Sequence, residues 1–272
     1  MCCLLIGLAA VCSAADADLD PKRLAEIQAL GKKDDAASRA ALLALIVDPK
    51  ADYNERDLAL RTIVLTHEGG MALLKLLDDE KFPDELKAPG SYAFAASPDA
   101  EVKALADKKL PVPKTKDKEP VPPIAKLAEM KGDSAAGALV FRDPKGPNCV
   151  NCHMLGKDGK FVGPPLDTIG DKLSKAQFYE AILTPSAAIE MSYEAWTVKT
   201  KKGEIKTGIL VENSDDRVAL RDTNGDFLEF APADVAMKKK QTLSLMPEGL
   251  TTTMTLKDLV NLVEFLSEQK PK

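Results

Sequence analysis

Residues 110–123, which read Leu-Pro-Val-Pro-Lys-Thr-Lys-Asp-Lys-Glu-Pro-Val-Pro-Pro, limit what this chain can fold into. This stretch holds five prolines and five charged side chains, a composition typical of an extended, solvated linker. The chain has 272 residues, which is room for roughly two domains of about 100–200 residues each. We therefore expect a domain boundary at this stretch, with a folded unit on either side.

The overall composition narrows the class of protein. Apolar residues make up 45% of the chain, which is enough to bury a core and excludes global disorder. The net charge is −5, with 37 Lys and Arg against 42 Asp and Glu. A dedicated nucleic-acid binder is expected to be basic, so this balance disfavours that function. No apolar run reaches the roughly 18–20 residues that a membrane span needs.

The first 15 residues are apolar and end in small residues around Cys12, as in a secretory signal peptide. We therefore expect export, to the periplasm or another extracytoplasmic space, with membrane attachment only if the chain is lipidated. A buried N-terminal helix is the alternative. Cleavage would leave Cys149 and Cys152 as the only two of the five cysteines, and two cysteines this close together do not form a disulfide scaffold.

The segment 19–109 is predicted to form short helices. Apolar residues recur there at helical spacing, and Pro and Gly pairs interrupt the pattern. Helices of about ten residues cannot bury an apolar stripe alone, so we expect them to stack in pairs. The pattern favours degenerate HEAT-like repeats, and an ordinary small helical bundle is the alternative.

After residue 123 the sequence again predicts helices, but a segment with the pattern of β-strands interrupts them. Candidate helices are 133–141, 174–183 and 256–267, the last with a capping box formed by Thr255 and Asp258. Residues 193–241 instead predict short antiparallel strands at 195–200, 205–211, 217–221 and 226–230, separated by turns. Strands of this kind form a small barrel or a meander.

The residues most informative about chemistry are Cys149, Cys152 and His153, which form a Cys-x-x-Cys-His motif. This is the attachment signature of c-type haem. Two thiols three positions apart on one helical turn can each add to a haem vinyl group, and the adjacent imidazole can then ligate the iron. Two alternatives remain. A structural zinc site needs four ligands, and His67 is the only further histidine. A dithiol redox pair normally lies in a βαβ setting, which the sequence does not predict.

Around this motif the sequence resembles the class I cytochromes c. Gly137 and Phe141 match the G-x-x-x-F of the N-terminal helix in that family, and Phe265 matches the aromatic residue at its crossing with the C-terminal helix. Residues 163–166, Gly-Pro-Pro-Leu, match the loop beside the proximal histidine. Residues 244–250, Ser-Leu-Met-Pro-Glu-Gly-Leu, match the loop that carries the methionine ligand. The resemblance implies that the Pro164 carbonyl accepts a hydrogen bond from His153, and that His153 and Met246 are the axial iron ligands.

The long insertion between His153 and Met246 makes the resemblance more specific. It is similar to the haem-binding domain of the Planctomycetes/Verrucomicrobia type, whose members often carry HEAT-like repeats upstream. We therefore expect a mainly α fold. A HEAT-like helical domain (19–109) would precede a cytochrome c domain (124–192 and 242–272), and a small β-barrel or meander (193–241) would interrupt the latter.

The function implied is that of an exported monohaem cytochrome c that carries single electrons and is not itself an enzyme. His/Met ligation leaves no open position on the iron. The implied partner is a redox protein such as a periplasmic sugar or alcohol dehydrogenase or a respiratory protein. Lysines at 199–206 and 238–240 either dock an acidic partner or simply solvate strand edges. Two further alternatives are a haem-based sensor or catalyst, if Met246 is not a stable ligand, and an interaction scaffold with structural haem.

Overall fold

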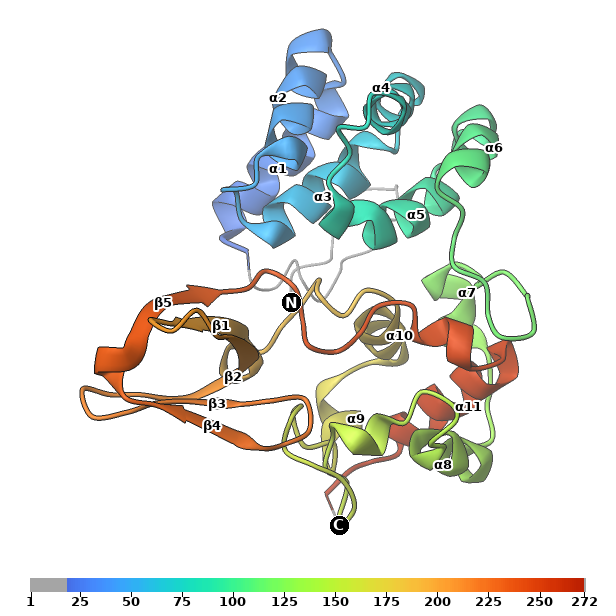
Figure 1. Ribbon diagram of the computed structural model, residues 1–272. Coiled ribbons are helices and arrows are strands. Elements are labelled where there is room, and N and C mark those ends of the chain that lie inside the picture. The colour runs from blue at the N-terminus through green and yellow to red at the C-terminus, as the bar shows by residue number, and fades with distance from the viewer. Residues whose placement is uncertain (1–18, 272) are drawn as a thin grey trace. The chain divides into compact units, whose positions relative to one another are not determined.

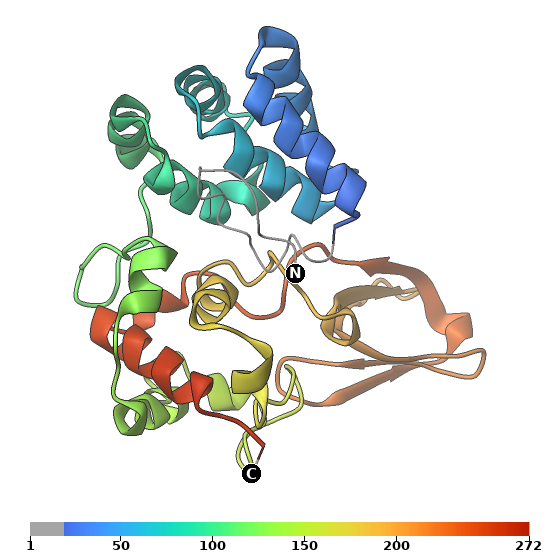
Figure 2. The same cartoon turned by 180° about the vertical axis from the view of Figure 1, so that it is seen from behind.

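The computed structural model describes residues 19–271, so the expected signal peptide at 1–15 lies outside the described residues. The chain divides into two compact units, one ending at Val112 and the other beginning at Pro113 (Figures 1 and 2). Between residues 19 and 271, no helix is both long and apolar enough to cross a membrane.

The first unit is built from short helices, as the sequence pattern predicts. Its α-helices are α1 (Pro21–Lys33), α2 (Ala36–Val47), α3 (Tyr53–Ile63), α4 (His67–Asp78), α5 (Lys87–Ala96) and α6 (Ala100–Lys109). Most begin at an Asp or Thr whose side chain accepts a hydrogen bond from the first-turn backbone. The helices share one apolar core that includes Ile27, Leu60 and Phe94. The HEAT-like nature of this unit stays a prediction.

The second unit contains the remaining helices, which are α7 (Ile124–Glu129), α8 (Ser134–Arg142), α9 (Ile169–Lys172), α10 (Lys175–Leu183) and α11 (Leu256–Ser267). Helices α8 and α11 cross closely, and the contact is made at Gly137. A Cβ atom there would lie 2.0 Å from the Asn261 carbonyl oxygen, so only glycine permits this approach. One turn further along, Phe141 and Phe265 pack with their ring centroids 5.9 Å apart.

The β module, residues 193–241, forms one antiparallel sheet of five strands. They are β1 (Ala195–Thr200), β2 (Ile205–Asn213), β3 (Val218–Arg221), β4 (Phe227–Phe230) and β5 (Val235–Lys240), in the spatial order β4-β3-β2-β1-β5. Of the two expected forms, the barrel is wrong, because β4 and β5 are the two edges and do not pair with each other. Strands β1 to β4 pair in chain order, as in the expected meander. Both edges carry charged side chains, such as Glu229 and Lys239, which oppose further pairing.

Strand β5 was not among the strands predicted from the sequence. Its residues, Val-Ala-Met-Lys-Lys-Lys, lack the alternation of apolar and polar side chains by which strands are recognised. Pairing with β1 makes it a strand, with Trp196 opposite Lys240 and Val198 opposite Lys238.

Part of the proline-rich stretch is folded rather than solvated. Thr115 is only 4% exposed, and its hydroxyl donates to the Glu119 carbonyl at 2.9 Å. The backbone amide of Lys116 donates to the Met254 carbonyl at 2.9 Å. Residues 113–121 are therefore a loop that packs on the second unit, and the backbone hydrogen bonds that hold it cannot be read from composition.

Candidate functional site

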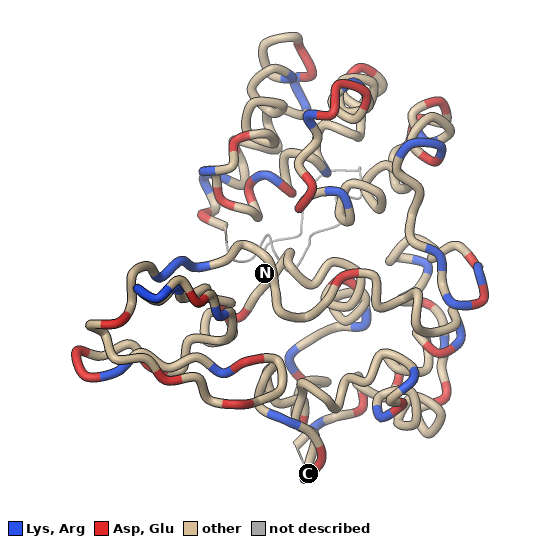
Figure 3. The backbone as a smooth tube through the Cα atoms, in the orientation of Figure 1, with Lys and Arg blue, Asp and Glu red and all other residues tan. Residues whose placement is uncertain are grey.

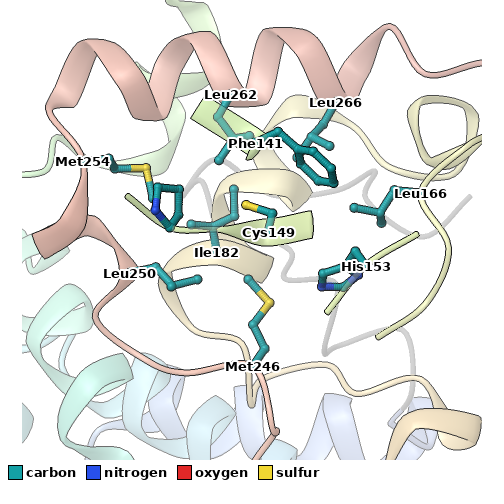
Figure 4. A pocket seen from close by; sticks show the side chains of 11 residues that line it. Phe141, Cys149, His153, Leu166, Ile182, Met246, Leu250, Met254, Leu262 and Leu266 are labelled. Carbon is teal, nitrogen blue, oxygen red and sulfur yellow. The ribbon is translucent and has the colours of Figure 1, made fainter. Parts of the chain in front are cut away.

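A small cavity of about 50 Å³ lies in the second unit beside the Cys-x-x-Cys-His motif (Figure 4). Helices α8, α10 and α11 contribute to its wall, together with the motif and the segment before α11. The lining residues are Phe141, Pro147, Cys149, His153, Leu166, Ile182, Met246, Leu250, Met254, Leu262 and Leu266. Apart from one imidazole, one thiol and two thioethers, every lining side chain is a hydrocarbon. The chemistry of this wall suits an apolar group held by a few specific side chains.

The motif itself forms a single tight turn. Residues Cys149–Asn151 are a short 3-10 helix that follows Asn148 in the left-handed conformation, with φ of 49°. The His153 amide donates to the Cys149 carbonyl at 2.9 Å. This turn brings Cys149 and His153 to the same cavity, whereas Cys152 is half-buried and does not line it.

The orientation of the His153 ring is set by the loop that follows. Its Nδ1 lies 2.8 Å from the Pro164 carbonyl oxygen, the contact that the family resemblance implies. A carbonyl can only accept, so Nδ1 carries the proton and Nε2 keeps a free lone pair. Burial lowers the pKa of His153, although the bond to Pro164 partly offsets this. The ring is therefore neutral at pH 7 and able to ligate a metal through Nε2.

Two glycines let this loop approach the motif. A Cβ atom at Gly163 would lie 2.5 Å from Cε1 of His153, so the backbone is in contact with the ring. Gly159 has φ of +106°, and a Cβ atom there would lie 2.0 Å from the His153 carbonyl oxygen. The sequence singled out Gly163 through its match to a known loop. Nothing local marked Gly159, because its role depends on a contact six positions away.

The two thiols are not activated. Burial raises the pKa of Cys149 to about 12, and it also raises that of Cys152, against a smaller opposing effect of Lys160. Dithiol redox catalysts instead carry a thiol whose pKa is lowered. The environment therefore disfavours the redox-pair alternative.

The structure also disfavours a structural zinc site. His67, the fourth ligand that such a site would need, belongs to α4 in the first unit. Its Nδ1 lies 3.0 Å from an Asp99 carboxylate oxygen, and that hydrogen bond raises the pKa of His67. Among residues 19–271, no group of three His, Cys, Asp or Glu side chains is placed to hold a metal ion.

Met246 lines the cavity, and its loop is tied to the rest of the second unit. The Met246 amide donates to the Ser244 hydroxyl at 3.1 Å, and the Ser244 amide donates to the Ser186 hydroxyl at 3.1 Å. Because Ser186 follows α10 and is buried, this relay anchors the methionine loop to that helix.

The structure also brings a second thioether, that of Met254, to the cavity. From the sequence, Met254, Met191 and Met237 rank below Met246 as ligands because no proline follows them. Met254 is 1% exposed, and Figure 4 shows it at the far end of the cavity from His153. Met191 and Met237 have exposed side chains, 83% and 45% respectively, and neither lines the cavity. Met246 therefore remains the better candidate to act together with His153.

The donor set fits a c-type haem. One imidazole with a free Nε2 and one thioether share an apolar cavity with a cysteine of the attachment motif. A hydrocarbon wall can contact a porphyrin, and the two donors are of the types that haem iron accepts in cytochromes c. His153 and Met246 would hold the iron, and Cys149 and Cys152 would carry the thioether links.

Comparison with known proteins adds little to this assignment. The chain matches no protein-family model, and no curated protein matches it. Among solved structures, the crystal structure of SoxXA from P. pantotrophus is similar, with 18% sequence identity and a TM-score of 0.28. The match covers 53% of this chain and 85% of that chain. A likeness this distant carries no conclusion about function, which has to be judged from the site.

Proposed function

We propose that this protein is a monohaem c-type cytochrome that carries single electrons. The observation that supports this most is that Cys149, His153 and Met246 line one apolar cavity. Bound haem would supply reversible one-electron exchange between ferric and ferrous iron. The chain would contribute the two covalent anchors, the two axial ligands and a wall that keeps water from the iron.

His153 and Met246 would have different roles as iron ligands. His153 would hold the iron through Nε2, because the Pro164 carbonyl keeps the proton on Nδ1. Met246 would supply the second iron ligand. A thioether ligand would raise the reduction potential relative to bis-histidine ligation, and it would close the iron to external ligands. A closed site favours a carrier over an enzyme or a gas sensor.

The partner we propose is an exported redox protein with an acidic surface. The relevant feature is a cluster of lysines on and between β1, β2 and β5, which are Lys199, Lys201, Lys202, Lys206 and Lys238–Lys240 (Figure 3). They come from both faces of the sheet, since Lys238 lies opposite Val198 and Lys239 opposite Thr197. On a chain of net charge −5, such a local patch would steer an acidic partner. A dehydrogenase or a respiratory protein of the extracytoplasmic space would fit this description.

Absorption spectroscopy of the full chain, produced with cytochrome c maturation, tests the proposal. We expect covalently attached haem and, in the ferric form, the far-red charge-transfer band of methionine-to-iron ligation. Met246→Leu should abolish the band, because leucine keeps the apolar volume but removes the sulfur. Met254→Leu is the matched control, since it makes the same change at the far end of the cavity, and it should keep the band.

Three other outcomes would overturn parts of the proposal. If Met254→Leu and not Met246→Leu removes the band, the axial assignment is wrong. If the ferrous wild-type protein binds carbon monoxide readily, the iron is open and the sensor or catalytic alternative is favoured. If no haem is attached covalently, the central assignment fails.

A further inference from the structure

The β module contacts the loop that follows the haem motif, and the contact is made by Arg221. This residue ends β3, and its guanidinium donates a hydrogen bond to the backbone carbonyl of Phe161. The guanidinium also lies 4.8 Å from the ring centroid of Phe227, which opposes it on β4. A stacked guanidinium has restricted freedom, so the donor is held ready for the carbonyl.

A second contact joins the same two parts. The turn between β3 and β4 contains Gly225, with φ of +87°. A Cβ atom there would lie 3.4 Å from Cδ of Lys160, so the turn rests against the residue before Phe161. The module and the loop therefore meet over neighbouring positions rather than through one isolated bond.

From Phe161 an unbroken series of contacts leads to the imidazole. The amides of Val162 and Gly163 both donate to the Cys152 carbonyl, at 3.0 and 2.7 Å. The Gly163 backbone is in contact with the His153 ring, and Pro164 accepts from Nδ1 at 2.8 Å. Each residue from 161 to 164 therefore contacts either the β module or the Cys-x-x-Cys-His motif.

We propose that Arg221 is a positioning residue, through which the β module clamps loop 161–164 and so sets the orientation and basicity of the His153 imidazole. This inference rests on the proposed function for its redox consequence. Its structural part, that Arg221 orders the loop, is independent of the haem. The inserted module would thus tune the haem site in addition to enlarging the protein.

The clamp has two measurable consequences. Without Arg221 the loop should open more often, which exposes the amides of Val162 and Gly163 to exchange. The bond from Nδ1 to Pro164 should also weaken, and a less basic imidazole stabilises ferric iron less well. The ferrous-to-ferric ratio at a fixed applied potential should then rise.

The test compares Arg221→Gln with Arg217→Gln in the full, matured chain. Arg217 is a matched control because it lies just before β3, and its partners Glu212 and Glu229 belong to the module itself. In Arg221→Gln we expect amide exchange at Val162 and Gly163 to accelerate on the order of tenfold, with a several-fold higher ferrous-to-ferric ratio. Arg217→Gln should match the wild type in both, and Arg221→Lys should lie in between.

Fluorescence of Trp196, the only tryptophan, checks that the module stays folded. If Arg221→Gln unfolds it, Arg221→Lys and Phe227→Leu carry the same comparison. The proposal is wrong if Arg221→Gln has the same amide exchange rates and the same ferrous-to-ferric ratio as Arg217→Gln. It is also wrong if the ferrous-to-ferric ratio of Arg221→Gln falls below that of the wild type. If the wild type attaches no haem, the proposed function fails, while amide exchange still decides whether Arg221 orders the loop.

Discussion

Replacing Gly137 by alanine places one methyl group in the close crossing of α8 and α11. The new Cβ atom would lie 2.0 Å from the Asn261 carbonyl oxygen and 2.7 Å from Cβ of Phe265, where ordinary contacts begin at 3.4 Å. The nearest of these atoms is backbone, so no change of rotamer relieves the contact. The two helices have to separate, which loosens the buried cluster around Phe141.

The expected cost follows from two opposing effects. Alanine favours a helix over glycine by about 1 kcal/mol. Overpacking of a tight core costs about 1–3 kcal/mol and occasionally more, and a backbone contact this short belongs at the upper end. We therefore expect a net loss of about 2 kcal/mol in the free energy of unfolding of the second unit. For a unit of this size, that lowers the Tm by about 4–8 °C.

Thermal unfolding followed by Trp196 fluorescence measures this loss, because the only tryptophan of the chain lies in the second unit. Ala135→Gly is the control. Ala135 is exposed on the same helix, so this change should cost only the helix propensity of about 1 kcal/mol. A Gly137→Ala protein with a Tm equal to or above that of the wild type would refute the reasoning, since propensity alone would then decide the outcome.

Three further changes test other parts of the second unit. Gly163→Ala puts a methyl group 2.5 Å from Cε1 of His153, so the methionine-to-iron band should weaken markedly in the absorption spectrum, and an unchanged spectrum would contradict the contact. The hydrogen bond from Lys175 holds the pKa of Glu264 below its usual 4.5, so the Glu264 carboxylate stabilises the fold above that pH and less as pH falls through its lowered pKa. In urea titrations, Glu264→Gln should therefore lose less stability than the wild type between pH 7 and pH 3, and parallel curves would argue against the pair. Thr255→Ala removes the N-cap of α11 and should cost about 1 kcal/mol in the same titrations, and a change near zero would show that the cap is not needed.

Helices α8, α10 and α11 were predicted because their signals are local, whereas the short helices α7 and α9 were not. Ser174 and Thr255 each cap a helix through a reciprocal hydrogen bond with the residue three positions on, and such spacing is visible in the sequence. The β module was less predictable. Strands β1 to β4 were recognised from the alternation of apolar and polar residues and from the turn residues between them. Strand β5 forms because it pairs with β1. Whether the sheet closes depends on its edges and not on any single strand.

The candidate site was also predictable only in part. The spacing of Cys149, Cys152 and His153 already indicates the proposed chemistry, because all three side chains come from one turn of the chain. The match of residues 163–166 to a known loop pointed to Pro164, whose carbonyl does lie against the imidazole. The sequence ranked Met254 below Met246 because no proline follows it, and nothing local shows that its side chain faces the cavity.

By itself, therefore, the sequence determined the longer helices, the first four strands, the helix caps and the five-residue motif. These depend on interactions that span three or four positions along the chain. Only the tertiary structure decided which thioethers reach the cavity, that the sheet stays open, and that Arg221 holds a carbonyl 60 residues away. Such contacts depend on how separate segments pack, and packing is a property of the whole unit that no local pattern records.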